Sequence, residues 1–102
     1  MQIIQEMTKR INDELADAER YARMANRWKE EQPEAAKLFL DLANAEVDHQ
    51  NKLHDQITKL IRRYRDKYGD PPREMLAVYN YLHDQAMDKA AEVMAHIKLF
   101  NG

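Results

Sequence analysis

Glu46-Val47-Asp48-His49 is the stretch that decides the fold, because it places a carboxylate and an imidazole three residues apart. On a helix, positions i and i+3 share one face. The apolar residues around the stretch recur at steps of three and four, the spacing of a buried helical stripe; they are Phe39, Leu42, Leu53, Ile57 and Leu60. Glu46 and His49 therefore stand where a helical core expects aliphatic residues. A carboxylate is rarely buried unless it is paired or bound to a metal, so the stretch predicts a partner, with a divalent metal as the first candidate.

Composition predicts one all-α domain over residues 1–102. The chain has only 2 Gly and 3 Pro, and the spans between them are rich in strong helix formers. Lys and Arg number 16 against 18 Asp and Glu, which argues against nucleic acid as a partner, because phosphate binding needs a basic excess. The absence of cysteine excludes disulfides and thiolate metal sites. No apolar run approaches the ~20 residues of a membrane span and no signal sequence opens the chain. We therefore expect a cytoplasmic protein without a membrane partner.

Glycine and proline divide the chain into three predicted helices, over residues 2–30, 33–67 and 71–99. The link Glu30-Glu31-Gln32-Pro33 is short, so the first two helices should pack as an antiparallel hairpin. The second link is Tyr68-Gly69-Asp70-Pro71-Pro72. In it, Gly69 is typical of a left-handed helix cap, and Asp70 is typical of an N-cap before a helix that opens at proline.

The first helix also carries a carboxylate on its apolar stripe. That stripe consists of Ile4, Met7, Ile11, Ala18, Tyr21, Ala25 and Trp28, and Glu14 falls within it. Glu14 lies about 17 residues before the first link and Glu46 about 14 after it, so at 1.5 Å per residue their heights agree to about one helical turn. Glu14, Glu46 and His49 are therefore expected in one layer. Two carboxylates and one imidazole are half the ligand set of a di-iron or di-manganese carboxylate site, and these donors suit iron, manganese or zinc.

The two predicted helices together resemble the first hairpin of the ferritin-like superfamily, above all rubrerythrin-type and encapsulated-ferritin proteins. The resemblance covers roughly residues 10–60 and rests on Glu14, Tyr21, Ala25, Phe39, Ala43, Glu46 and His49. It implies that Glu14 and His49 are terminal metal ligands, that Glu46 is a bridging ligand, and that Tyr21 lies close to the metals. It also implies a catalytic role for these four residues in ferroxidase-type iron oxidation.

The third predicted helix departs from the rubrerythrin pattern, because its apolar stripe carries no inward glutamate. Asp88 and Glu92 lie about 160° from that stripe. Rubrerythrins take the second half of the site from further helices of the same chain, whereas encapsulated ferritins take it from a second subunit. We therefore expect two subunits to pair across a two-fold axis and complete a four-helix bundle. Each pair would hold two irons, with manganese or zinc as alternatives, in an even-numbered homo-oligomer that a protein shell could enclose. The third helix would then be a cover or an oligomer contact.

A metal-free interpretation also fits the residues. Glu46 and His49 would then form a hydrogen-bonded pair that fixes packing, Glu14 would reach solvent or an arginine, and the chain would be a helical scaffold with a degenerate ferritin-like hairpin. His83 is expected to be a core histidine, with a role as an extra ligand left open, and His54 a structural residue. One internal echo, Asn51-Lys52-Leu53-His54-Asp55-Gln56 against Asn80-Tyr81-Leu82-His83-Asp84-Gln85, is interpreted as chance.

Overall fold

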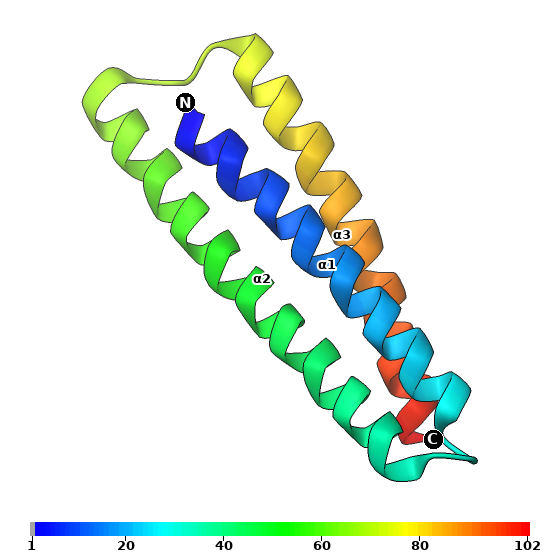
Figure 1. Cartoon of the computed structure of the whole chain (residues 1–102). Helices are drawn as coiled ribbons and strands as arrows, with labels where there is room; N and C mark the ends of the chain where they lie inside the picture. The colour runs from blue at the N-terminus through cyan, green and yellow to red at the C-terminus, as the bar shows by residue number, and fades with distance from the viewer. Residues whose placement is uncertain (1) are drawn as a thin grey trace.

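The computed structural model describes residues 2–102, which form three helices and, within that range, no strand. The helices are α1 (Gln2–Trp28), α2 (Pro33–Tyr68) and α3 (Arg73–Asn101). Figure 1 shows α1 and α2 as an antiparallel hairpin, with α3 packed along α1, whereas α2 and α3 meet over a short region only. The bundle is elongated, with principal extents of 56 × 20 × 18 Å. The predicted all-α fold is confirmed, and α1 is its central helix.

The first link begins earlier than the sequence predicts. Helix α1 ends at Trp28 rather than at residue 30, because the chain already turns there: the Gln32 N–H donates to the Trp28 carbonyl oxygen at 2.8 Å. Pro33 is the first residue of α2, where the N–H that proline lacks would have no helical partner. The tight link holds α1 and α2 side by side, as predicted for a hairpin.

The second link gives Gly69 the positive φ expected of a cap, although its ψ of −164° is not that of the left-handed helical region, and it contradicts the prediction for Asp70. Gly69 has a φ of +81° and its N–H donates to the Arg65 carbonyl oxygen at 2.9 Å. The N-cap position of α3 belongs to Pro72, and the Asp70 carboxylate lies 3.6 Å from Arg65 Nε instead. A residue that precedes proline is held out of the helical region, so Pro71 cannot open the helix and α3 starts at Arg73.

The core lies along both sides of α1 in two clusters. At the end near the first link, alanines of α1 let the other two helices approach closely; this cluster is Ala18, Ala22, Ala25, Leu40, Ala43, Val93 and Ile97. At the other end, larger side chains fill the space between the helices; this cluster is Ile4, Ile11, Leu15, Ile57 and Ala86. Leu15 is fully buried and is the central large side chain of α1.

Helix α2 is rotated relative to the predicted stripe. Its buried residues are Ala36, Leu40, Ala43, Gln50 and Ile57, whereas Phe39, Leu42, Leu53 and Leu60 are only half-buried. The prediction that Glu46 and His49 belong to the closed core is wrong for a single chain, because α2 turns its most buried face toward α1. The face of the hairpin that points away from α3 stays open. We call it the open face; it carries some of the half-buried residues of both helices, among them Glu14 and Glu46.

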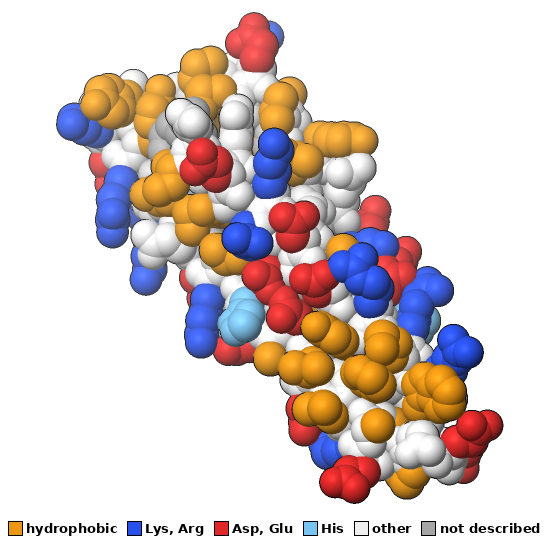
Figure 2. Space-filling model, viewed as in Figure 1, with side chains coloured by type: hydrophobic (Ala, Val, Ile, Leu, Met, Phe, Trp, Pro, Cys, Tyr) orange, Lys and Arg blue, Asp and Glu red, His pale blue; other side chains and the backbone are white. Residues whose placement is uncertain are grey.

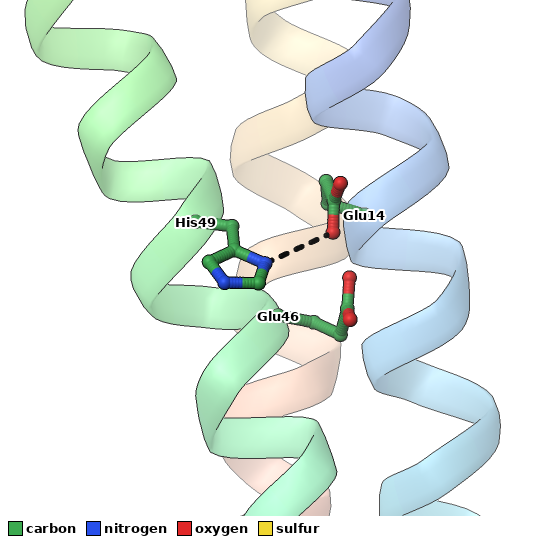
Figure 3. Close-up of side chains that lie close together, drawn as sticks. All are labelled: Glu14, Glu46 and His49. Carbon is green, nitrogen blue, oxygen red and sulfur yellow. Dashed lines mark ion pairs between the residues drawn. The ribbon is translucent and has the colours of Figure 1, made fainter.

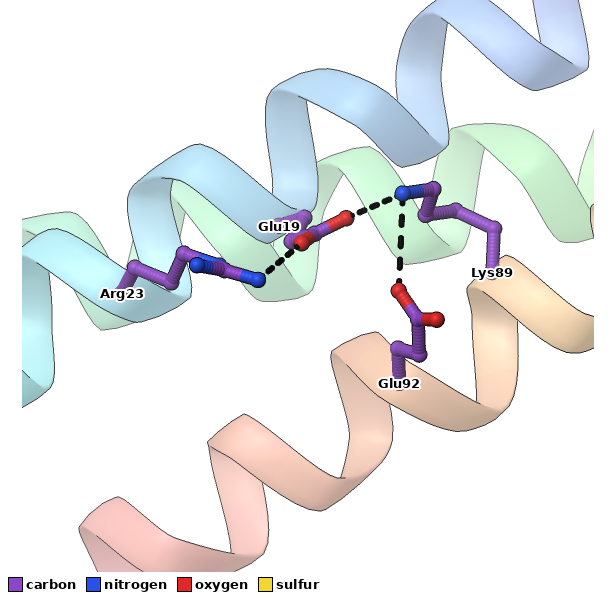
Figure 4. Close-up of polar contacts among 4 residues, drawn as sticks. All are labelled: Glu19, Arg23, Lys89 and Glu92. Carbon is purple, nitrogen blue, oxygen red and sulfur yellow. Dashed lines mark hydrogen bonds and ion pairs between the residues drawn. The ribbon is translucent and has the colours of Figure 1, made fainter.

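Polar contacts fix α3 against α1 (Figure 4). Lys89 Nζ donates to Glu19 Oε2 at 2.5 Å, and Glu19 also pairs with Arg23 at 2.7 Å. The Glu19 side chain is only 12% exposed, and the hydrogen bond from Lys89 holds the pKa of its carboxyl below the usual range. Nearer the chain end, Asn26 Nδ2 donates to the His96 carbonyl oxygen at 2.8 Å. These contacts determine where α3 lies and so which face of the hairpin stays open.

None of the three helices has the length and apolar character to cross a membrane, over the residues that the structure describes.

Candidate metal centre

Glu14 of α1 meets Glu46 and His49 of α2 on the open face (Figure 3). Because the first link is tight and both helices rise 1.5 Å per residue, positions at similar distances from the link come to the same height. Glu46 and His49 follow one another by three residues, so both side chains project toward α1 from adjacent turns. The layer that the sequence predicts is therefore present.

The three side chains are close enough to share one ion. His49 Nδ1 lies 3.5 Å from Glu14 Oε2, and each residue offers one donor atom within 4.8 Å of the other two. Donors on a single ion with bonds of about 2.1 Å lie at most about 4.2 Å apart, so small rotamer changes bring all three into range. Among residues 2–102, this is the one group of three or more such side chains that gathers this closely.

The centre is sheltered on its inner side and open on its outer side. The Glu14 side chain is 18% exposed and the His49 side chain 54% exposed, while Glu46 is half-buried. Figure 2 shows the acidic side chains and a histidine at the middle of the open face, with a band of hydrophobic side chains toward the first link. By helical spacing, this face includes the half-buried Tyr21 and Trp28 of α1 and Phe39 and Leu42 of α2.

The donor set fits a hard or borderline divalent ion. Two carboxylate oxygens and one imidazole nitrogen suit iron, manganese or zinc, and no thiolate is present in the sequence to favour a softer metal. Three ligands leave coordination positions open on the exposed side. The same geometry allows a metal-free contact, because a protonated His49 would form an ion pair with Glu14.

Tyr21 lies two helical turns from Glu14 on α1 and packs against the cluster of small residues near the first link. Within residues 2–102 no hydrogen bond joins its hydroxyl to Glu14, Glu46 or His49. Its predicted place near the metals stays a prediction. His96 is half-buried on α3 and is not part of the group.

One polar contact was missed from the sequence. His54 of α2 and His83 of α3 lie in ring contact, with centroids 5.1 Å apart. The only feature of the sequence that links the two histidines is the repeated Leu-His-Asp-Gln segment. We interpret that repeat as chance, because the two histidines fall at different places on the apolar stripes of their helices. Rotation of α2 brings His54 to the side that faces α3.

Comparison with known proteins gives one match. The family model described as rubrerythrin matches residues 7–99, a span that includes Glu14, Glu46 and His49 and nearly all of α3. Neither a curated protein nor a solved structure matches the chain. Rubrerythrins are di-iron carboxylate proteins of the ferritin-like superfamily, so the family match agrees with the predicted resemblance and with the carboxylate and histidine group.

Proposed function

The chain belongs to the rubrerythrin family, and on that premise we propose that it oxidises Fe²⁺ at a two-metal carboxylate centre shared between two copies of the chain. The observation that carries the proposal is the convergence of Glu14, Glu46 and His49 on a face that α3 leaves uncovered. A complete site of this class takes four carboxylates and two histidines. One chain supplies half of that set.

The missing half has no source on α3. The acidic residues of that helix are all exposed; they are Glu74, Asp84, Asp88 and Glu92. Figure 3 shows α3 behind the hairpin when the centre faces the viewer. A two-fold axis that lies in the plane of the interface, parallel to the open face, would instead bring a second Glu14, Glu46 and His49 opposite the first. The α1–α2 hairpins of the two copies would then form a four-helix bundle around the metals.

The apolar surroundings of the centre support such pairing. Tyr21, Trp28, Phe39 and Leu42 are half-buried within one chain, and Leu38 on the same helix is 57% exposed. A second hairpin would cover this band. Burial of a large apolar side chain contributes about 1.5–3 kcal/mol, so a few such residues from each copy give a substantial drive to association.

The charges of the carboxylates link metal binding to the pairing of two copies. Each copy brings the two carboxylates of Glu14 and Glu46, so two copies bring four negative charges into one layer. Two divalent ions balance that charge. In their absence the carboxylates repel one another across the interface, so metal binding and pairing should strengthen each other.

Each of the three side chains would then have its own role. As the family resemblance implies, Glu14 and His49 would be terminal ligands and Glu46 a ligand shared by the two metals. Iron held there would supply the redox chemistry, the transfer of one electron from each of two Fe²⁺ to dioxygen, which with two protons becomes hydrogen peroxide. The half-buried apolar band excludes water from the layer, and Tyr21 lies in that band.

Anaerobic loading with Fe²⁺ followed by air tests the proposal, with absorbance in the near ultraviolet and light scattering recorded together. About one iron per chain, rapid oxidation and an even-numbered oligomer are expected. Glu46→Ala should abolish oxidation. The control is Asp48→Asn, since Asp48 lies on the far side of the same helix, 3.1 Å from Lys52. If iron is neither bound nor oxidised, the Glu14–His49 contact is a packing pair and the metal-free scaffold is the correct interpretation.

A further inference from the structure

A second cluster of metal-ligating side chains lies between α2 and α3. The imidazole rings of His54 and His83 are 5.1 Å apart between centroids, with their planes inclined by 31°. The ring of Tyr79 stacks on His83 at 5.7 Å. All three side chains are half-buried. The two histidines come from the pair of helices that contact each other least, so they form one of the few links between α2 and α3.

The ring nitrogens of both histidines are free to accept a ligand. Within residues 2–102, neither imidazole takes part in a hydrogen bond or an ion pair, although each lies in ring contact. No buried side-chain nitrogen or oxygen in that range lacks a partner, so these nitrogens must reach solvent. A transition metal binds to an imidazole nitrogen that solvent can reach and that has no hydrogen-bond partner in the protein.

A small cavity opens beside both rings. Its volume is about 10 Å³, and the polar side chains on its wall are His54, His83, Tyr79 and Thr8. That volume is close to the smallest that holds a single water molecule. The Thr8 hydroxyl donates its proton to the Ile4 carbonyl oxygen at 2.7 Å. It can therefore only accept a further hydrogen bond. The cavity is therefore sized for one small occupant, and the rest of its wall is apolar; it consists of Ile11, Ile57 and Ala86.

We propose that His54 and His83 form a second metal site, for a divalent transition ion such as Zn²⁺, Cu²⁺ or Ni²⁺. With a metal–nitrogen bond of about 2.1 Å and a ring centroid about 1.1 Å beyond the nitrogen, two imidazoles on a tetrahedral ion have centroids about 5.2 Å apart. The observed separation is 5.1 Å. Imidazole donors without carboxylates suit these ions better than Mg²⁺ or Ca²⁺.

Water would supply the remaining ligands of the ion, from the side on which the ring nitrogens reach solvent. An ion held by one histidine from each helix would tie α2 to α3 at a place where few apolar contacts do so. The site stabilises the position of α3.

The second site is separate from the Glu14, Glu46 and His49 centre. His54 lies eight residues after Glu46 on α2, which is about 12 Å along the axis and about 80° around it. The first centre belongs to the open face, whereas the second lies at the contact between α2 and α3. Loss of one should leave the other intact.

Zn²⁺ binding to a variant that carries both Glu14→Ala and Glu46→Ala tests the proposal, because that variant keeps only one donor of the first centre, His49. Calorimetry should give one Zn²⁺ per chain. Free Zn²⁺ at 100 times the Kd should raise the melting temperature by roughly 10 °C. Adding His54→Gln or His83→Gln should weaken Zn²⁺ binding by more than about 100-fold. Loss of a residue that only hydrogen-bonds to a metal ligand costs less, about 10- to 100-fold. Adding His96→Gln is the matched control and should change nothing.

Two results would overturn the second site: no Zn²⁺ uptake by the variant with Glu14→Ala and Glu46→Ala, or uptake that survives both histidine substitutions. If adding a histidine substitution prevents folding, proton NMR of the folded variant with Glu14→Ala and Glu46→Ala decides instead. Zn²⁺ must then shift the ring protons of His54 and His83 and leave those of His49 and His96 in place. Iron oxidation by a His83→Gln protein should equal that of the unaltered chain, so failure of the second site is distinguishable from failure of the first.

Discussion

Glu46→Gln should change the stability of the protein in opposite directions with and without metal. The substitution keeps the size of the side chain and removes one negative charge. Without metal, Glu14 and Glu46 place like charges near each other, and removing one relieves their repulsion. With metal, the same substitution removes a ligand and so removes the stabilisation that the bound ion provides.

The distance between the two carboxylates sets the size of the metal-free effect. Their donor atoms lie within 4.8 Å of each other, and two unit charges at that limit repel by about 3.5 kcal/mol at an effective dielectric constant of 20 and by about 0.9 kcal/mol in bulk water. Because the centre is open on one side, the lower figure applies, and we expect Glu46→Gln to stabilise the metal-free protein by about 1 kcal/mol. In metal at 100 times the Kd, loss of binding costs about 2.7 kcal/mol.

Urea unfolding with a chelator and with excess Mn²⁺ measures both effects, since Mn²⁺ suits the same donors and is not oxidised by air under mild conditions. Asp48→Asn is the control and should stay within about 0.5 kcal/mol in both buffers. The reasoning is refuted if Glu46→Gln destabilises the protein equally in chelator and in Mn²⁺. Glu46 would then be a packing group whose hydrogen bonds matter more than its charge.

Three other predictions concern the fold that holds the centre in place. Leu15→Ala removes a fully buried side chain and should lower the free energy of unfolding by about 2–5 kcal/mol in a urea titration. Glu19→Gln should destabilise the protein at pH 7, and the difference from the unaltered chain should shrink as the pH falls below the ordinary range of a glutamate carboxyl. The carboxyl pKa is lowered in the folded protein by Lys89, so its contribution is present above the unfolded pKa and is lost as pH falls through the folded value. Gly69→Ala should cost about 1–3 kcal/mol of unfolding free energy, since φ is +81° and ψ −164°. A Cβ at Gly69 meets nothing within 4 Å, so a cost near zero would show that the link relaxes freely.

The three helices and the layer of candidate ligands could be predicted because both follow from local rules. Proline and glycine mark the links, and the helical rise fixes the height of Glu14 against Glu46 once the hairpin is short. The helix ends were less predictable. Two consecutive prolines moved the start of α3 to Arg73, and Asp70, which has the right side chain for a cap, pairs with Arg65 instead.

The rotation of α2 could not be predicted, because periodicity identifies an apolar face without identifying the neighbour that covers it. The stripe through Phe39 and Leu42 is real, but within residues 2–102 the other helices cover it only in part, so His49 is 54% exposed. The contact between His54 and His83 depends on the same rotation. A sequence pattern within one helix carries no information on where a helix about thirty residues away will meet it.

An apolar stripe that its own chain leaves half-exposed is itself an argument about assembly. Single apolar residues on a surface are ordinary, but here they follow the periodicity of a core and flank two carboxylates and an imidazole. Covering the stripe with apolar surface alone would bury the charges of Glu14 and Glu46 without compensation, which costs several kcal/mol for each ion. A second copy of the hairpin with two divalent ions would cover the apolar residues and neutralise the carboxylates together. The ligands and the stripe therefore favour the same occupant, and neither is satisfied by the three helices of one chain.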